Sequence, residues 1–312
     1  MTVPPSLNVL DAIGNTPLVE LRRIVPEGAA RVVIKLESSN PTGSMKDRVA
    51  SAMVGAAIAN GRLKPSGTVV EYTGGTTGVS LALICAARGY HAHFVTSDAF
   101  SEEKRRTMRA YGAELTEIPS DGKKINKALI TAMIAKAKEI SEQPLHWFCD
   151  QLANADGEAG YHALGQEMWE QSGGRVDALV QSVGTAHSIH GTAHALRRNN
   201  PNLFVLAVEP AESQVLGGKT PGSHKIEGIG IGFLPPLWRR DEVDEVVGVS
   251  TDDANAMARR LAREEAIFAG TSTGANVIAA IALAERLGEG KTVGTIAVDS
   301  GLRYLSTDAY GA

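Results

Sequence analysis

Residues 68–96, TVVEYTGGTTGVSLALICAARGYHAHFVT, combine a strand, a glycine-rich turn, an apolar helix and a second strand. In the first strand segment, 68–73, the successive residues Val69 and Val70 place apolar side chains on both faces, which is typical of a parallel strand covered by helices on both sides. Further segments of this character alternate with stretches of helical periodicity. They are 31–37, 91–96, 114–119, 178–183, 204–209, 243–249 and 292–298. The alternation predicts an α/β fold of three-layer α/β/α domains with mostly parallel sheets.

Length and composition fit a globular chain of more than one domain. The 312 residues are 43% apolar and 21% charged, which is ordinary for a soluble protein. That length fits one large domain or two of about 150 residues. A charged helical stretch, residues 120–146, contains Pro144 just before a strand-like segment. We expect a domain change near that point.

Charge, hydropathy and cysteine content exclude several classes of function. The net charge of −4 argues against a nucleic-acid partner, because binding to the phosphate backbone needs a basic face. No apolar run reaches the ~20 residues that span a bilayer, and the N-terminus lacks the features of a secretory signal. Cys85 and Cys149 are too few for a disulfide framework or a four-ligand zinc site. We therefore expect a cytoplasmic protein that binds neither nucleic acid nor a membrane.

Glycine and small polar residues gather at four turns where an expected strand meets an expected helix. These turns are SSNPTGSMKDRVA (38–50), EYTGGTTGVSLA (71–82), QSVGTAHSIHG (181–191) and FAGTSTGANV (268–277). Consecutive glycines let backbone amides converge on an anion, and threonine hydroxyl groups add donors. The second and third turns therefore predict anion-binding loops, the third suited to a phosphate.

Lys46 stands in the first of these turns, at the start of an expected helix. A lone lysine at such a place is usually a surface residue. A cation beside the positive end of a helix dipole is disfavoured, however, which favours the neutral and nucleophilic amine. Lys46 is therefore a candidate for a lysine that forms a Schiff base.

Other sites for ligands find less support in the sequence. The P-loop pattern GxxxxGK[ST] is missing, and GxGxxG fails at the first strand-to-helix turn. His187, His190 and His194 are spaced i, i+3 and i+7 on one helix face. Neither HExxH nor a suitably spaced carboxylate accompanies them, so we expect no metal site.

Taken together, these loops resemble the pyridoxal-phosphate enzymes of the tryptophan synthase β fold (fold type II). The resemblance is closest to the cysteine synthase and cystathionine β-synthase family. It extends from GNTPLVEL (14–21) to DSGLRYLST (299–307), nearly the whole chain. It implies that Lys46, in NPTGSMKDR, forms the Schiff base with pyridoxal 5'-phosphate and acts as general base. It also implies that Ser272, in GTSTG, faces the pyridine nitrogen of the cofactor.

The resemblance assigns the remaining site residues to three segments. TGGTT stands where the family binds the substrate carboxylate, GTAHS stands in the phosphate cup, and GIGIGFLP forms a loop that walls the cofactor. The implied cofactor-binding residues are Lys46, Thr76, Gly184, Thr185, Ala186, His187, Ser188 and Ser272. The implied substrate-binding residues are Thr73, Gly74, Gly75, Thr76, Thr77 and Gly228.

The implied reaction is β-replacement on an activated serine similar to O-acetylserine. Sulfide or another thiol adds to an aminoacrylate intermediate and gives cysteine or a related amino acid. Two alternatives remain open: a β-eliminating lyase or dehydratase of a hydroxy amino acid, and a catalytically silent relative that binds a protein partner. The family also implies a homodimer, with a small, mobile substrate-binding domain (1–13 and 39–146) and a large cofactor-binding domain (14–38 and 147–312).

The chain departs from the family pattern in two of these loops. The carboxylate loop usually reads Thr-Ser-Gly-Asn-Thr, whereas Gly74 and Thr76 stand here for the serine and the asparagine. The phosphate cup usually reads Gly-Thr-Gly-Gly-Thr, and residues 186–188 are Ala-His-Ser here. We expect the missing side chain at Gly74 to open room beside the substrate's β-carbon. A bulkier or differently polar amino acid than O-acetylserine would then be accepted.

Overall fold

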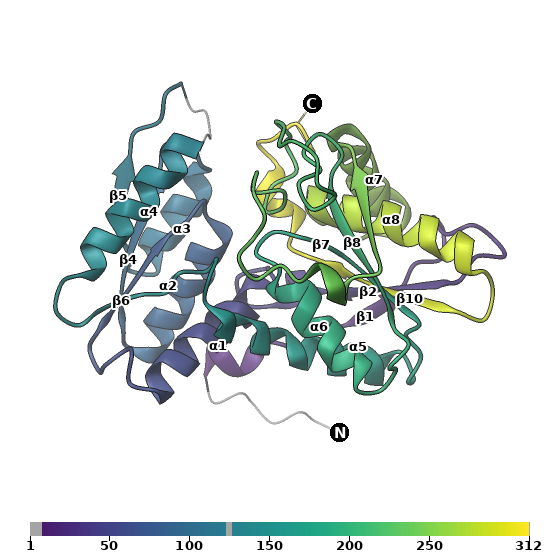
Figure 1. Ribbon diagram of the computed structural model, residues 1–312, viewed down its shortest axis with the longest axis horizontal. Coiled ribbons are helices and arrows are strands. Elements are labelled where there is room, and N and C mark those ends of the chain that lie inside the picture. Colours follow the sequence, from purple (N-terminus) through teal and green to yellow (C-terminus); the bar gives the residue numbers. More distant parts are fainter. Residues whose placement is uncertain (1–7, 123–126, 312) are drawn as a thin grey trace. The chain divides into compact units, whose positions relative to one another are not determined.

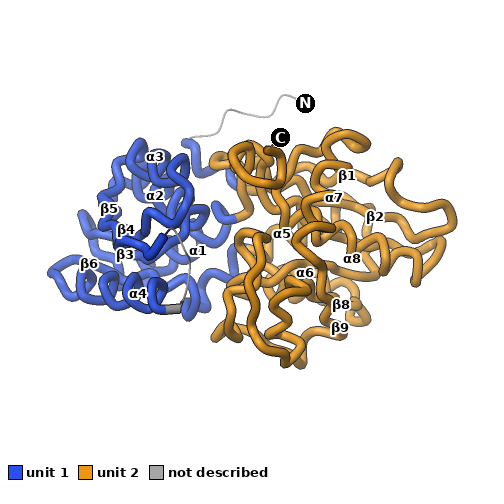
Figure 2. Tube along the Cα trace, turned by 90° about the horizontal axis from the view of Figure 1, so that it is seen from above, with its two compact units in different colours: residues 1–13, 46–160 blue, residues 14–45, 161–312 orange. Residues whose placement is uncertain are grey.

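The computed structural model describes residues 8–122 and 127–311, and the chain divides into two compact units (Figure 2). Unit 1 comprises residues 1–13 and 46–160, and unit 2 comprises residues 14–45 and 161–312. Within the described ranges, no helix is long and apolar enough to cross a membrane.

Unit 1 is built on a four-stranded parallel sheet in the order β5-β4-β3-β6 (Figure 1). Its strands are β3 (Thr68–Tyr72), β4 (His91–Ser97), β5 (Glu114–Ile118) and β6 (His146–Phe148). Its helices are α1 (Lys46–Ala59), α2 (Thr76–Arg88), α3 (Glu102–Ala110) and α4 (Lys127–Ser141). Met133 and Ala137 of α4 are fully buried in one apolar cluster with Val70 and Val95 of the sheet. Ser101 is the N-cap of α3, since its side chain accepts a hydrogen bond from the Lys104 N–H.

Unit 2 contains a six-stranded sheet in the order β1-β2-β10-β7-β8-β9, in which only β1 runs antiparallel to its neighbour. Its strands are β1 (Leu18–Glu20), β2 (Arg31–Leu36), β7 (Ala178–Ser182), β8 (Phe204–Pro210), β9 (Glu245–Val249) and β10 (Thr292–Ala297). Its helices are α5 (His162–Gln171), α6 (His187–Arg197), α7 (Thr251–Glu264) and α8 (Thr271–Leu287). Figure 1 shows α5 and α6 on one face of this sheet and α7 and α8 on the other.

The alternation of side chains along β2 shows how both faces of this sheet are covered. Ile34 is fully buried in the apolar cluster that includes residues of α7 and α8. The next residue, Lys35, is also fully buried, and its ammonium lies 2.8 Å from the Glu167 carboxylate of α5. Its ammonium also donates to Gln171 Oε1 at 2.8 Å. A charge so deeply buried needs such partners, because the loss of hydration is otherwise too costly.

The expected fold class is confirmed: each segment expected as a strand contains one, and the sheets are mostly parallel. The compact units change over at 45/46 and 160/161, whereas the proposed domains change at 38/39 and 146/147. Residues up to Met45 belong with unit 2 because the Met45 N–H donates to Val298 O at 2.9 Å, just beyond β10. Residues after 146 belong with unit 1 because β6 pairs with β3, and Gly160 lies against the Arg48 backbone.

Candidate functional site

The loop between β7 and α6 in unit 2 carries a set of backbone donors that point to an anion. α6 begins at His187, and the first amide groups of a helix have no partner within it. In the part of the chain that the structure describes, the N–H groups of Gly184, Thr185, Ala186 and Ser188 have no acceptor. Such a convergence at a helix N-terminus suits a phosphate.

Residues 184 and 186 of this loop stand at two positions where the family pattern has glycine. A Cβ atom on Gly184 would overlap the carbonyl oxygen of Gly228, so the structure brings these two predicted site residues together. Ala186 stands where the family's cup has glycine, and it adopts a left-handed φ of 72°. The loop therefore keeps a left-handed backbone at residue 186 despite the substitution. That conformation costs an ordinary L-residue about 1–2 kcal/mol.

The side chains of the same loop are held by their neighbours. The Thr185 hydroxyl lies 2.8 Å from His187 Nδ1, and His187 is buried rather than facing solvent. Ser188 Oγ accepts a hydrogen bond of 3.1 Å from Gln181 Nε2. The Ser188 hydroxyl proton therefore remains available for an anion in the loop.

Gln181 is a site residue that sequence reasoning missed. Its side chain is fully buried in β7, where it joins the phosphate loop to α8. Its Oε1 accepts a 2.9 Å hydrogen bond from Asn276 Nδ2, and Asn276 Oδ1 in turn accepts from the Ser182 N–H at 2.7 Å. The available signal was a glutamine in the centre of an otherwise apolar strand, because a buried amide needs partners nearby.

Ser272 lies in the first turn of α8, behind a tightly packed glycine. A Cβ on Gly270 would overlap the Asp299 carboxylate and lie 2.5 Å from Tyr304 Cε2, which explains why the loop requires glycine there. Ser272 is 1% exposed, yet its hydroxyl has no hydrogen-bond partner among the described residues. The Thr271 hydroxyl beside it is likewise buried without a partner. Buried hydroxyl groups are normally satisfied, so this place suits a bound polar group.

Lys46 is the first residue of α1, as predicted, and it directly follows a segment anchored in unit 2. Ser44 forms an isolated bridge with Asp299, and the Met45 N–H donates to Val298 O at 2.9 Å. The Val298 N–H donates to Thr273 Oγ1 of α8 at 3.0 Å. The chain that leads into Lys46 is therefore attached to the end of β10, where α8 also begins.

The loop between β3 and α2 in unit 1 is a second set of unused backbone donors. The N–H groups of Gly74, Thr76 and Thr77 have no acceptor in the ranges that the structure describes. Thr73 is used within the loop, because its buried hydroxyl accepts from the N–H groups of Gly75 (3.0 Å) and Gly78 (3.1 Å). The predicted carboxylate loop thus offers three amides at the N-terminus of a helix, a geometry that suits an anion.

The glycines of this loop pack against a row of side chains from the region of α3. Phe100, Lys104 and Met108 are spaced by four residues and face Gly74, Gly75 and Gly78 in that order. A Cβ on Gly74 would lie 2.8 Å from Phe100 Cε1, and one on Gly78 would lie 2.5 Å from Met108 Sδ. The expectation that Gly74 leaves open room is therefore wrong in the direction of its Cβ, because the Phe100 ring occupies that space.

His190 and His194, on one face of α6, both contact the carboxylate of Glu242. His190 Nδ1 and His194 Nε2 both lie 2.9 Å from Glu242 Oε2, in the short helix Arg240–Glu242. Partial burial raises the pKa of Glu242, but the Arg239 hydrogen bond and the two imidazoles outweigh it and lower that pKa. His190 also accepts from the Arg239 N–H. The pair therefore ties the long connection before β9 to α6.

Comparisons with known proteins agree with this arrangement. Residues 9–299 match the family described as pyridoxal-phosphate dependent enzyme. A cysteine synthase of Staphylococcus aureus is 42% identical over 312 residues, 99% of each chain. The crystal structure of a cysteine synthase from Entamoeba histolytica has a TM-score of 0.92 at 38% identity, covering 99% of this chain and 93% of its own. An O-ureido-L-serine synthase has a TM-score of 0.90 at 36% identity, covering 98% and 96%. The chain therefore belongs to the family of pyridoxal-phosphate-dependent enzymes.

Proposed function

We propose that this protein catalyses β-replacement on an activated serine, similar to O-acetylserine, with sulfide or another thiol as nucleophile. The observation that carries this proposal is a pair of loops with unused amides, one at the start of α6 and one at the start of α2. One suits the phosphate of the cofactor, and the other suits the carboxylate of an amino acid. Full-length similarity to cysteine synthases supports the same assignment.

The residues of unit 2 fit pyridoxal phosphate. The amides of residues 184–186 and 188, together with the hydroxyl groups of Thr185 and Ser188, would hold its phosphate. Ser272, a buried residue, would donate to the ring nitrogen and leave that nitrogen unprotonated. When bound, the cofactor supplies an aldehyde that condenses with amines and a ring that withdraws electrons from the substrate's α-carbon.

In this proposal Lys46 carries the cofactor at rest and removes the proton from the substrate's α-carbon when a substrate is bound. The helix start disfavours a charged ammonium at this position, which suits an amine that must act as nucleophile and then as base. The amides of Gly74, Thr76 and Thr77 hold the substrate carboxylate and so orient the proton that Lys46 removes. Thr76 stands in place of asparagine and offers one donor from a shorter side chain.

We further propose that the protein acts as a cytoplasmic homodimer in which unit 1 is the mobile, substrate-binding part. Resemblance to the family supports the dimer and the mobility. The free, buried state of Cys85 and Cys149 suits a reducing compartment. Light scattering of the purified protein tests the dimer directly.

Product analysis with O-acetylserine tests the reaction. Thiol-dependent formation of cysteine supports β-replacement. Pyruvate and ammonia formed with or without sulfide would instead identify the eliminating lyase, an alternative that a neighbouring structure described as a hydrogen sulfide-producing enzyme keeps open. Lys46→Ala is the control, since it should lose nearly all turnover and the borohydride-reducible attachment of the cofactor. Attachment to another lysine would contradict the assignment.

A further inference from the structure

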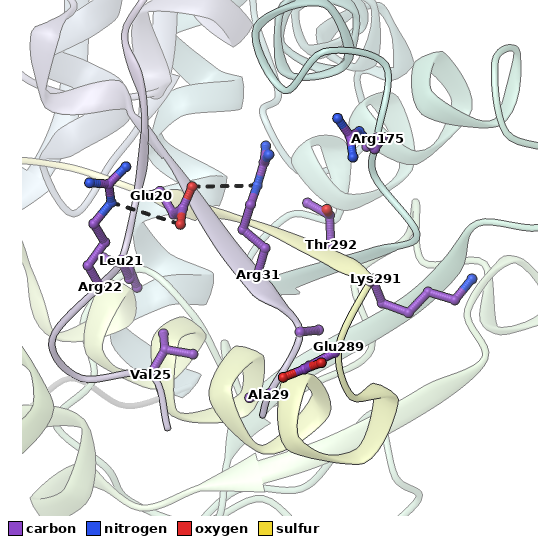
Figure 3. A pocket seen from close by; sticks show the side chains of 12 residues that line it. Glu20, Leu21, Arg22, Val25, Ala29, Arg31, Arg175, Glu289, Lys291 and Thr292 are labelled. Atoms are coloured by element: carbon purple, nitrogen blue, oxygen red, sulfur yellow. Dashed lines mark ion pairs between the residues drawn. The ribbon is translucent and has the colours of Figure 1, made fainter. Parts of the chain in front are cut away.

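Unit 2 contains a cavity of about 410 Å³ that the proposed reaction does not use (Figure 3). That volume falls within the range of about 300–1,000 Å³ found for small-molecule sites. The cavity is lined by Glu20, Leu21, Arg22, Val25, Ala29, Ala30, Arg31, Arg175, Glu289, Gly290, Lys291 and Thr292. These residues come from four separate segments of the chain, so folding alone assembles the cavity.

The cavity lies at the amino ends of β2 and β10, the opposite end of the strands from the phosphate loop. Arg31 and Thr292 are the first residues of the parallel strands β2 and β10. The phosphate loop instead follows the carboxyl end of β7, and the turn before Ser272 lies beside the carboxyl end of β10, where Ala269 forms a bridge with Ser300. β10 is six residues long, which corresponds to about 20 Å at ~3.3 Å per residue. A small ligand in this cavity therefore cannot touch the reacting atoms.

Charge in the cavity favours an anion. Four cationic side chains line it against two carboxylates. Lys291 is paired with Asp177 at 2.9 Å, which leaves an excess of one positive charge. Glu20 reaches Arg31 and Arg22 only at 3.8 and 3.9 Å, beyond hydrogen-bond distance. The Arg175 guanidinium has no acceptor among the residues that the structure describes. Arginine side chains are typical partners of a phosphate, because their planar donors match its oxygen atoms.

Ser172, just after α5, contacts the Arg31 side chain and the Arg175 backbone. Its carbonyl oxygen accepts from the Arg31 guanidinium at 3.2 Å, and its hydroxyl oxygen accepts from the Arg175 N–H at 3.2 Å. Ser172 itself is buried and donates to Trp169 O at 2.8 Å. The Arg31 side chain is thereby fixed while a third of it stays exposed. Such prior ordering lowers the entropic cost of binding.

The other end of the cavity has a different character. Figure 3 shows Arg31 and Arg175 at one end, and Val25, Ala29 and Glu289 at the other. Val25 and Ala29 are partly exposed and provide the apolar surface, with the buried Leu21 and Ala30 beneath them. Glu289 is exposed, and its carboxylate has no partner within the described part of the chain. This end offers an apolar contact and an acceptor for hydroxyl or amino groups.

We propose that this cavity is a second ligand site, which binds a nucleoside monophosphate. The phosphate lies against Arg31 and Arg175, the base packs on Val25 and Ala29, and Glu289 accepts from a ribose hydroxyl or a base amino group. A phosphate paired with exposed guanidinium groups is screened by salt, so affinity falls as ionic strength rises. The assignment does not depend on which reaction the protein catalyses.

Calorimetric titration of the holoenzyme, freed of excess cofactor, with AMP tests the proposal. The expected result is one site per chain, with adenosine and inorganic phosphate each binding at least tenfold more weakly. Arg175→Ala should weaken AMP at least tenfold, and Glu289→Gln should weaken it severalfold. Arg198→Ala, which removes an exposed arginine outside the cavity, is the matched control and should change nothing.

Three outcomes would overturn the proposal. One is the absence of AMP binding at millimolar concentration. Another is equal affinity for inorganic phosphate, because the apolar end would then contribute nothing. The third is AMP binding that survives Arg175→Ala unchanged, which would place the nucleotide elsewhere. Thermal unfolding of each variant without ligand shows that the substitutions leave the fold intact, since these side chains are at the surface.

Discussion

The Phe100 ring occupies the space that a side chain at residue 74 would need. A Cβ on Gly74 would lie 2.8, 3.0 and 3.3 Å from three carbon atoms of that ring. The backbone of Gly74 is outside the left-handed region, so it would accept serine without strain. It is therefore the ring that requires glycine at this position. An apolar face replaces the hydroxyl that the family usually places beside the carboxylate loop.

Restoring serine at this position is expected to impair the enzyme unless the ring is removed as well. Gly74→Ser should lower kcat/KM for O-acetylserine about tenfold, because the new side chain displaces Phe100 and the loop moves with it. Gly74→Ser combined with Phe100→Ala should recover most of the loss. The four proteins form a double-mutant cycle, in which contacting residues couple by about 0.5–3 kcal/mol. Strictly additive effects would show that the contact does not govern the loop.

The Phe100 contact illustrates what the sequence does not predict. The strands and the glycine-rich turns follow from apolar runs and local composition, which act over a few residues. The approach of Phe100 to Gly74 depends on how α3 packs against α2, so no local pattern reports it. The row formed with Lys104 and Met108 has helical spacing, but spacing alone does not identify the loop that it faces.

The candidate site likewise contains residues that local sequence patterns predict and residues that they do not. Lys46 was predicted from its motif at the start of a helix, and Ser272 from the family resemblance of the segment GTSTG. Gln181 was missed, because its partners Ser188 and Asn276 come from two other segments. The proposed phosphate-binding residues Arg31 and Arg175 were not predicted either. Each looks like an ordinary surface charge in the sequence, and only the fold brings both next to Ser172, just after α5.

Ser272 is expected to control the charge of the cofactor ring. Ser272→Ala removes the only side-chain donor proposed for the ring nitrogen and should slow turnover about tenfold. Ser272→Asp should hold a proton on that nitrogen and shift the product balance toward transamination. Absorbance spectra of the bound cofactor and product analysis measure both effects. Thr192→Val, which removes a buried hydroxyl without a partner, should change neither. Unchanged products in Ser272→Asp would place Ser272 away from the cofactor.

Gln181 is expected to affect cofactor affinity and stability in separable ways. Gln181→Leu removes the donor to Ser188 Oγ and one of the two acceptors of Asn276 Nδ2, which should cost about 1–3 kcal/mol of unfolding free energy. Gln181→Glu keeps the acceptor for Asn276 but attracts the Ser188 hydroxyl proton away from the phosphate. Its dissociation constant for pyridoxal phosphate should therefore rise more than its stability falls. Urea unfolding of the apoenzyme and cofactor titration distinguish the two, and equal cofactor affinity in wild type and Gln181→Glu would contradict this role.

Glu71, beside the carboxylate loop, is expected to make stability depend on pH. Its carboxyl is fully buried in β3 and accepts from the N–H groups of Tyr72 (3.0 Å) and Gln151 (2.9 Å). Burial raises its pKa from 4.5 to about 8, although these hydrogen bonds oppose the shift. Between those two values the folded protein keeps a proton that the unfolded chain releases. The free energy of unfolding should therefore fall as pH rises from about 5 to 8.

Replacing Glu71 should remove that dependence. Glu71→Gln carries no titrating group, so its urea-unfolding free energy should vary less between pH 5 and 8 than that of the wild type. The largest possible slope from one proton is about 1.4 kcal/mol per pH unit, and relaxation around the charged carboxylate reduces it. Glu142→Gln, at an exposed position of the same unit, controls for the loss of one surface carboxylate and should keep the wild-type slope. If Glu71→Gln retains that slope as well, the proton resides on another group, and Glu71 is ionised throughout this range.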